Sequence, residues 1–399
     1  MLTDDSLCVH RKSGRPGLAE LVPVPVPAPQ LAPPAGPPPG VHAEKFVLMV
    51  SGSPGDAQRY RCSNKLEEFE YLGLTADSIV SEQADWERDL WRYEMFLLHR
   101  VQNSPPVERF IKHAQQLGKR VVYDTDDLVF DERPDRLAPF TRYYSPRALR
   151  LHRNFTYRNG RALELSDAAI VSTERLRDSI KELFPEKPVY LHRNAASRRF
   201  VELVDTIRAT YVRPKSDLVR IAYVSGSKTH QDDFAECVRP LRRLLQRYPQ
   251  VRLMAVGHID IPAEVKDLAA QVEAVPPVPW YQVPLCYGMV DINLAPLELN
   301  NLFTESKSEL KYFEPALLEI PTAASDIAPF RVGITHGETG FLCANEDQWY
   351  DALERLVLDA DLRARIGKAA RTDVLARYTT QTRSENLKLI LDQIAELPR

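Results

Sequence analysis

Residues 219–248 read VRIAYVSGSKTHQDDFAECVRPLRRLLQRY, and this stretch carries the repeating unit of the fold. Its first six residues form an apolar run of strand length, bounded by a polar, glycine-bearing loop. Phe234, Val238, Leu241 and Leu245 then recur at the spacing of one helix face. A strand, a loop and a helix in this order are typical of α/β folds with a parallel sheet.

The same alternation continues along the chain from residue 45. The expected strands are 46–50, 95–98, 120–123, 168–171 and 189–191 in the first half, and 219–224, 252–256, 291–294, 321–324 and 340–342 in the second. A final amphipathic stretch at 382–397 is expected to be a closing helix. The sequence therefore predicts an α/β fold with two Rossmann-like units.

Length and composition suggest how the chain is divided. A chain of 399 residues that is 44% hydrophobic is long enough for two packed cores. Residues 21–40 are rich in proline, which favours an extended, solvated backbone. We expect a disordered tail at 1–43, a first domain at 44–200, a second at 201–380 and a closing helix at 381–399. The tail is expected to be a spacer or a segment that binds an SH3-like partner. Proline-rich segments are more often spacers, and we favour that interpretation.

Charge and motif counts argue against several classes of protein. A formal net charge of −3 gives no reason to expect a nucleic-acid partner. Five scattered cysteines without a CxxC pair, and nine histidines without an HExxH pair, favour neither a disulfide framework nor a zinc site. No apolar window approaches the roughly 20 residues that a membrane span needs. We expect a cytoplasmic protein, with at most a peripheral contact at the inner face of a membrane.

The loop at 225–230 joins a strand to the start of a helix. Free backbone N–H groups and the positive end of the helix dipole meet at such a point, and this suits a diphosphate. The loop adds hydroxyls, a glycine and basic side chains, namely Ser225, Gly226, Ser227, Lys228 and His230. An ordinary turn with a surface lysine is the alternative, and the loop alone does not decide between them.

Lys307, Lys311 and Glu314 follow one another at intervals of four and three residues. On a continuous helix they would share a face, where two ammonium groups could hold a pyrophosphate and the carboxylate a sugar or ribose hydroxyl. A solvated Lys/Glu face is the commoner meaning of this spacing. Pro315 also lacks the amide that would bond the carbonyl of Lys311, so the helix must begin late, kink or hold Pro315 in its first turn.

Three carboxylates, Asp124, Asp126 and Asp127, follow an expected strand. Ligands of open α/β sheets bind at this end of the strands, so the carboxylates can face a substrate or cap the next segment. The Asp-x-Asp spacing also matches a motif that holds a divalent metal with a nucleotide. We discount a metal because the motif lies in the first unit, whereas the diphosphate candidates lie in the second.

The loop at 51–61 also follows an expected strand. Gly52 permits a close backbone approach, and Arg59 and Arg61 can grip an anionic acceptor. A flexible turn with solvated arginines is the alternative.

The segment 307–379 resembles the C-terminal half of group 1 retaining glycosyltransferases of the GT-B fold. The resemblance rests on Glu314 opening a helix, an xPxxAS strand at 320–325, a His-Gly-x-x-Gly turn at 336–340 and a trailing helical pair that ends in Tyr378. Four further segments look like a bacterial subfamily that assembles surface polysaccharides: FLLHRVQN (96–103), KRVVYDTDDLVFD (119–131), 223–234 and 291–314. The likeness extends from about residue 45 to 397.

The resemblance implies two Rossmann-like domains facing a cleft, and transfer of a sugar from a nucleotide diphosphate sugar to a glycan or lipid-linked acceptor. Glu314 corresponds to the second glutamate of the family's E-x7-E motif. The first falls at Ser306, with Glu305 beside it. Lys307 and Lys311 stand where relatives present glycines and apolar residues, so phosphate neutralisation is expected to rest on these lysines.

The resulting site prediction assigns a role to each candidate. The catalytic set is Glu314, Lys307, Lys311, Asp126 and Asp127; the donor-binding set is Ser225, Gly226, Ser227, Lys228, His230 and Ser308; the acceptor side is Gly52, Arg59 and Arg61. We expect no metal and no cofactor besides the nucleotide sugar, and a retaining reaction in which the leaving phosphate accepts the acceptor's proton. The alternatives are a non-catalytic protein that binds a nucleotide or glycan, suggested by Ser306, and a nucleotide-sugar epimerase.

Overall fold

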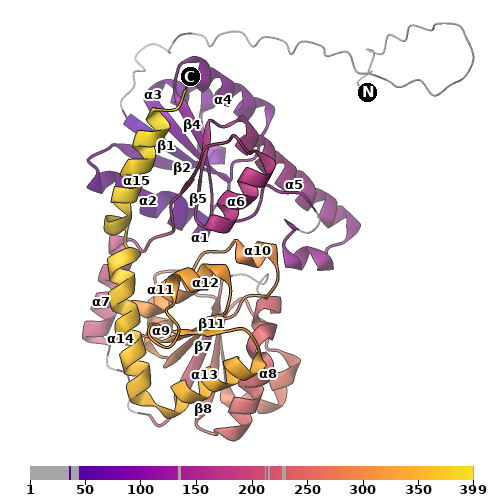
Figure 1. The fold of residues 1–399 in the computed structure, drawn as a ribbon, viewed down its shortest axis with the longest axis vertical. Coiled ribbons are helices and arrows are strands. Elements are labelled where there is room, and N and C mark those ends of the chain that lie inside the picture. Colours follow the sequence, from indigo (N-terminus) through magenta and orange to yellow (C-terminus); the bar gives the residue numbers. More distant parts are fainter. Residues whose placement is uncertain are drawn as a thin grey trace, which may run out of the picture. The chain divides into compact units, whose positions relative to one another are not determined.

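The computed structural model describes residues 36, 45–133, 136–211, 213, 216–226 and 231–398. The tail predicted at 1–43 lies outside these residues, apart from residue 36. Two parallel six-stranded sheets, each with its own helices, make up the fold (Figure 1). We call the first sheet and its helices the first lobe, and the second sheet and its helices the second lobe.

The first sheet has the strand order β2-β1-β3-β4-β5-β6. Its strands are β1 (Lys45–Ser51), β2 (Ala76–Val80), β3 (Tyr93–His99), β4 (Arg120–Thr125), β5 (Ala168–Val171) and β6 (Val189–Leu191). The helices between them are α1 (Asp56–Gln58), the π-helix η1 (Arg59–Ser63), α2 (Asn64–Tyr71), η2 (Ser81–Gln83), α3 (Trp86–Arg92), α4 (Pro105–Gln116), η4 (Pro139–Tyr143), α5 (Pro146–Leu165) and α6 (Glu174–Leu183).

The second sheet has the strand order β12-β11-β10-β7-β8-β9. Its strands are β7 (Val219–Ser225), β8 (Val251–Gly257), β9 (Val272–Val275), β10 (Ile292–Ala295), β11 (Thr322–Ser325) and β12 (Phe341–Cys343). After α7 (Arg198–Thr210), the helices are α8 (Gln231–Arg247), η6 (Ala263–Gln271), α9 (Val283–Gly288), α10 (Leu302–Glu305), α11 (Leu310–Ala316), α12 (Ala328–Gly333), α13 (Glu346–Leu358), α14 (Ala360–Arg377) and α15 (Thr380–Ala395). No described helix is both long and apolar enough to cross a membrane.

The last helix, α15, returns to the first lobe. Leu387, Ile390, Leu391 and Ile394 are buried in one core with strand residues of the first sheet. Thr379 starts the helix with a capping box that satisfies the first free amides. The predicted closing helix is therefore present, and its apolar face completes the core of the first lobe rather than of the second.

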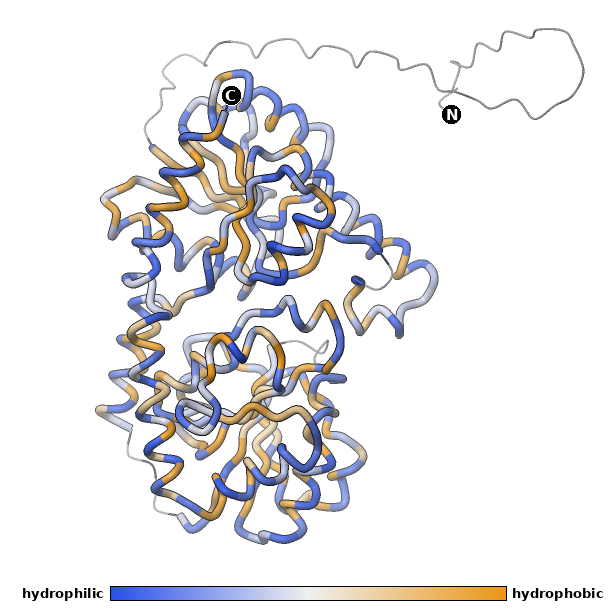
Figure 2. The backbone as a smooth tube through the Cα atoms, viewed as in Figure 1, coloured by the Kyte–Doolittle hydropathy of each residue, from blue (hydrophilic) through white to orange (hydrophobic). Residues whose placement is uncertain are grey.

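Ten strands lie close to their predicted positions, whereas β2 and β9 were not predicted. Both are edge strands, and their residues are half-buried or exposed. An edge strand need not be apolar along its length, because it buries less surface than a central one, and ADSIV and VEAV are interrupted by acidic residues, whereas the edge strands β6 (VYL) and β12 (FLC) are not. The central strands, which Figure 2 shows in the colours of hydrophobic residues, carry that run.

The segment around Pro315 is broken into two short helices. Helix α10 ends at Glu305 and α11 begins at Leu310, so Lys307 lies in the connection and does not share a helix with Lys311. Pro315 lies inside α11 and leaves the carbonyl of Lys311 without its helical donor. The Nδ2 of Asn293, on β10, donates to that carbonyl at 2.7 Å. Asn293 thus fixes α11 to the second sheet.

Replacing Asn293 by alanine should lower the free energy of unfolding by about 1–3 kcal/mol, because the Lys311 carbonyl would lose its donor inside the protein. Urea denaturation measures this loss. In a Pro315→Ala background the new amide can bond the same carbonyl, so the cost of Asn293→Ala should shrink. The exposed Asn154→Ala change is the control. Equal costs in both backgrounds would contradict this role of Asn293.

Candidate active site

A cavity of about 540 Å³ lies at the carboxyl ends of strands from both sheets. Its polar lining comprises Asp56, Arg59, Tyr60, Arg100, Asp126 and Asp127 from the first lobe, and Ser225, Gly226, His258, Lys307, Ser308, Lys311 and Glu314 from the second. Most of the predicted residues that the structure describes are therefore brought together here. Parallel α/β sheets bind ligands at this edge.

Glu314 is held by two residues of the first lobe. Arg59 donates from Nη2 to Glu314 Oε1 at 3.1 Å, and the hydroxyl of Tyr60 donates to the same oxygen. The guanidinium of Arg59 lies 4.2 Å from the ring centroid of Tyr60 and 5.2 Å from that of Trp280. Burial raises the pKa of Tyr60 well above its ordinary value, so the hydroxyl keeps its proton. The predicted donor-binding carboxylate therefore faces the first lobe.

The two lysines differ in their partners. Lys307 Nζ lies 3.0 and 3.1 Å from the two carboxylate oxygens of Asp127, across the two lobes. The Nζ of Lys311 is buried, 4.2 Å from the ring centroid of Tyr223, and has no hydrogen-bond partner in the part of the chain that the structure describes. Burial lowers the pKa of Lys311 from 10.5 to about 8, although the charge of Asp233 opposes the shift. Lys311 is thus a cavity cation that lacks a bonded counter-charge.

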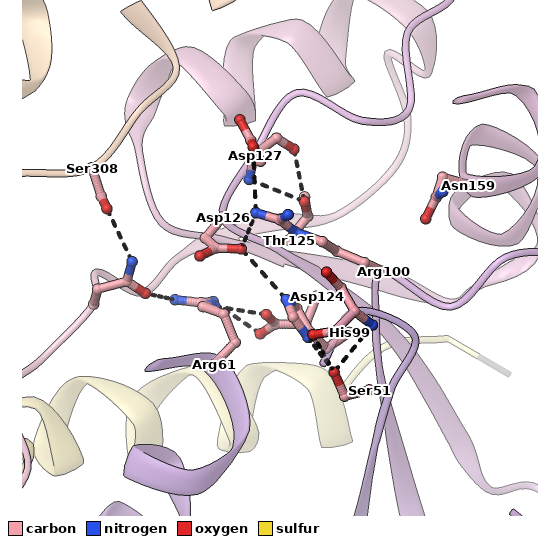
Figure 3. A network of polar contacts seen from close by, with 12 residues as sticks. Ser51, Arg61, His99, Arg100, Asp124, Thr125, Asp126, Asp127, Asn159 and Ser308 are labelled. Carbon is pink, nitrogen blue, oxygen red and sulfur yellow. Dashed lines mark hydrogen bonds and ion pairs between the residues drawn. The ribbon is translucent and has the colours of Figure 1, made fainter. Parts of the chain in front are cut away.

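Asp126 and Asp127 lie beside Arg100 (Figure 3). Arg100 Nη2 is 2.6 Å from Asp126 Oδ1 and 3.6 Å from Asp127 Oδ2. Burial opposes the charge on Asp126, but Arg100 and His99 hold the pKa of its carboxyl well below the usual range. Both carboxylates line the cavity as predicted, and Asp126 does so in the ionised form.

The backbone of Arg100 is in the left-handed region, with φ of 48°. A non-glycine residue rarely adopts this conformation, and such residues gather at functional sites. Gly52 lies against it: a Cβ at residue 52 would come within 2.4 Å of the Arg100 carbonyl oxygen. Gly52 therefore does not line the cavity, contrary to its predicted acceptor role, and instead permits the close packing of the loops after β1 and β3.

Arg61 also departs from its predicted role. It is 1% exposed, and its Nε and Nη2 lie 2.7 and 2.9 Å from the oxygens of Asp124 (Figure 3). Lys65 Nζ approaches Asp124 Oδ2 at 2.6 Å. Arg61 is thus held inside the first lobe and cannot grip an acceptor. Asp124 is likewise occupied by two cations, so the Asp-x-Asp motif does not present paired free carboxylates.

The remaining predicted donor residues divide into two groups. Ser225, Gly226 and Ser308 line the cavity, and Ser308 Oγ lies 3.0 Å from the Asn194 side-chain amide. Ser227, Lys228 and His230 lie outside the described residues, so their predicted contacts stay predictions.

The position of the missing first glutamate does not face the cavity. Ser306 is fully buried, and its hydroxyl donates to the carbonyl of Leu302 at 2.8 Å. The Glu305 carboxylate accepts from the backbone amide of Ala328 at 2.9 Å, at the start of α12. Glu305 therefore does not replace the first glutamate in space.

Several cavity residues had no role in the sequence-based prediction, among them Asp56, Tyr60, Arg100, His258 and Trp280. Tyr60 stands between the two arginines singled out in the sequence, and Arg100 stands within the FLLHRVQN segment. Arg100 is distinguished by its left-handed backbone conformation, which cannot be predicted from the identity of the residue.

Comparison with known proteins assigns the second lobe. Residues 219–359 match the family model described as "Glycosyl transferases group 1". This chain carries a group 1 glycosyltransferase domain. No match was found among curated protein sequences.

Three solved structures show the fold that this glycosyltransferase shares. Anabaena HepE, solved with UDP and glucose, has a TM-score of 0.58 at 12% identity and covers 88% of this chain and 100% of its own. Sucrose-phosphate synthase of Thermosynechococcus elongatus has a TM-score of 0.58 at 13% sequence identity, and the match covers 88% of this chain and 99% of the synthase. A putative UDP-N-acetylglucosamine 2-epimerase of Listeria monocytogenes has a TM-score of 0.51 at 10% sequence identity, and the match covers 89% of this chain and 98% of that protein. The predicted two-domain GT-B fold and the predicted group 1 glycosyltransferase domain are confirmed, whereas the retaining reaction and the surface-polysaccharide subfamily stay predictions.

Binding of a nucleoside diphosphate should weaken as pH rises above about 8. The ammonium form of Lys311 attracts phosphate, and this form is lost from the empty cavity above its pKa of about 8, so affinity should fall by up to about tenfold per pH unit. Calorimetric titration at pH 7, 8 and 9 measures the effect.

The control for this experiment is the Lys311→Arg variant, which stays charged over the whole range and should give a flat profile. The same slope in the wild type and in this variant would show that another group is titrating.

Proposed function

We propose that this glycosyltransferase transfers a sugar from a nucleotide diphosphate sugar to a glycan or lipid-linked acceptor in cell-surface polysaccharide synthesis. The reaction takes place in the cytoplasm, retains the anomeric configuration and uses no metal ion. The observation that carries the proposal is the buried ammonium of Lys311, which has no hydrogen-bond partner among the described residues and lies in the same cavity as Glu314, inside the group 1 domain.

The diphosphate is assigned to the cations of the second lobe. Departure of a nucleoside diphosphate develops negative charge, which a preorganised site must offset. Lys311 and Lys307 supply positive charge, and Ser225 and Gly226 line the cavity just before α8, where the helix dipole favours anions. Anabaena HepE was solved with UDP and glucose, and a nucleotide sugar in the cavity of this chain is part of the proposal.

The nucleoside is assigned to the apolar side of the cavity. Val256, Val278, Val283, Tyr287 and Trp280 line this part, at or near the ends of β8, β9 and α9. A few polar groups on a largely apolar wall are typical of small-molecule sites. The base therefore lies against these side chains, and Glu314 is left to contact hydroxyls of the ribose or the sugar.

The acceptor is assigned to the first lobe, beside Asp126 and Asp127. In the structure Lys307 forms an ion pair with Asp127, and Glu314 forms one with Arg59. When the donor binds, Lys307 and Glu314 would contact the donor instead of the first lobe. Asp127 and Arg59 would then be available to an acceptor. The leaving phosphate accepts the proton of the acceptor hydroxyl, so the mechanism needs no separate protein base.

A second candidate is a protein of this fold that binds a nucleotide or glycan without turnover. The burial of Ser306 and the helix-capping role of Glu305 favour it, because neither residue offers a carboxylate to the cavity. Intact nucleotide binding without consumption of the donor would support this candidate. An epimerase would instead convert the nucleotide sugar when no acceptor is present, which product analysis detects.

The test of the proposed function is a thermal-shift panel of UDP, GDP, CDP, dTDP and ADP, each with magnesium and with EDTA. A ligand present at about 100 times its dissociation constant stabilises the folded state by roughly 2.7 kcal/mol. One nucleotide should stand out, because the base is bound by a pocket, and its shift should persist in EDTA. A shift that disappears in EDTA would contradict the metal-free assignment, and no shift with any nucleotide would contradict the donor assignment.

Glu314→Gln should lower turnover of the matching nucleotide sugar by about 10²-fold or more, because the donor hydroxyls lose a charged acceptor. The amide is nearly isosteric and still accepts a hydrogen bond from Tyr60 or Arg59, so the melting temperature should change little. The control is Glu338→Gln, at an exposed site without a charged partner among the described residues. Unchanged turnover with a lower melting temperature would assign Glu314 a structural role only.

A further inference from the structure

Residues 137–163 have a charge unlike that of the rest of the chain. The segment contains six arginines and no aspartate or glutamate, whereas the whole chain has a formal net charge of −3. The arginines are Arg142, Arg147, Arg150, Arg153, Arg158 and Arg161. The segment forms η4 and the greater part of α5.

The amino-terminal half of α5 packs little against the sheet. The buried residues of the helix, Thr156, Asn159, Ala162 and Leu163, all lie in its second half. The first half is instead held to η4 and its C-cap by ring contacts: the His152 ring lies 6.0 Å from that of Phe140 and 5.9 Å from that of Tyr144, between centroids. We call residues 139–157 the arm; Figure 1 shows α5 extending beyond the first sheet.

The arm exposes large apolar and aromatic side chains. Tyr143 is 69% exposed, Leu151 62% and Tyr157 56%, and Tyr144 is also exposed. These four are a third of the twelve large hydrophobic side chains that are exposed in the described part of the chain. Exposed apolar groups that cluster in this way mark an interaction surface.

Three arginines of the arm have no counter-charge among the described residues. Arg147, Arg150 and Arg153 are exposed and form no ion pair with any described residue. Helix α8 offers a contrast, because its exposed arginines are paired: Arg239 with Glu346, Arg243 with Asp347 and Arg247 with Glu354. The positive charge of the arm is therefore available to an anionic partner.

We propose that the arm is a docking surface for a bilayer that contains anionic lipids. Arginines near such a surface are attracted by its negative potential, and tyrosine and leucine side chains favour the boundary between head groups and acyl chains. Arginines alone would fit a soluble polyanion equally well, but Leu151 and Tyr157 gain from an apolar phase that only the bilayer offers. This surface lies outside the cavity and does not depend on the proposed reaction.

The position of the arm suits a substrate that is delivered from the membrane. Arg142 binds Glu298 of the second lobe at 2.9 Å, and the Phe140 ring lies 6.1 Å from that of Phe303. The Phe303 ring in turn lies 4.3 Å from the ammonium of Lys307, which lines the cavity. A bilayer on the outer side of the arm would therefore be close to the cavity wall.

Sedimentation of the full chain with lipid vesicles tests the proposal. The protein should bind vesicles that contain phosphatidylglycerol, bind phosphatidylcholine vesicles weakly, and lose binding as salt is raised. The combined change Arg147→Glu, Arg150→Glu and Arg153→Glu should weaken binding by at least about tenfold. The matched control, Arg239→Glu with Arg243→Glu and Arg247→Glu on α8, should bind as the wild type does.

Two further measurements separate the apolar contribution and the fold. Leu151→Ser with Tyr157→Ser should also weaken vesicle binding, because both residues would lose their place in the bilayer. Each arm variant should keep the wild-type melting temperature and nucleotide-induced shift, so a failure of vesicle binding is distinguishable from a failure of the proposed function. The proposal would be overturned if the protein bound both lipids equally well, or if the α8 control lost as much binding as the arm variant. It would also be overturned if the Leu151/Tyr157 variant bound vesicles as the wild type does and soluble heparin competed for that binding.

Discussion

Glu314 and the Arg59–Tyr60 pair meet across the cavity, and this contact makes the active site a property of both lobes. The carboxylate comes from a short helix of the second lobe, and both of its donors come from the π-helix η1 of the first lobe. Lys307 and Asp127 form a second contact of the same kind. Because these groups are partly desolvated, each needs a partner of opposite charge or a hydrogen-bonding group. A ligand therefore has to replace protein contacts, rather than simply fill a space.

A buried ion-pair cluster fixes the wall of the cavity that the first lobe provides. Asp124 is bound by Arg61 and Lys65, all three 1% exposed. Removing one partner from such a cluster leaves a buried charge, which is far more costly than the cluster itself is favourable. The arrangement holds the end of β4 in one position, and Asp126 and Asp127 follow directly from it. Residues of a functional site are held in their positions by supporting contacts of this kind.

Periodicity was enough to predict most of the fold. Central strands bury both faces and so carry a continuous apolar run, whereas the edge strands β2 and β9 do not. The site was predicted less completely. Glu314, Lys307, Lys311, Asp126 and Asp127 line the cavity, but the sequence shows no difference between Arg59, which lines it, and Arg61, which is buried two residues later. That difference arises because both residues lie on η1, where side chains two positions apart point to different sides of the helix.

The departures from ordinary local rules gather around the cavity. Arg100 has a left-handed backbone, Pro315 interrupts a helix, and Ser306 stands where the family's motif has a glutamate. Two of these departures are compensated by a neighbour: Gly52 makes room for the first, and Asn293 bonds the carbonyl left by the second. Departures that are compensated in this way persist where function needs an unusual geometry. The third has no such compensation among the described residues, because the Ser306 hydroxyl bonds a carbonyl of its own helix and the Glu305 carboxylate bonds the amide of Ala328.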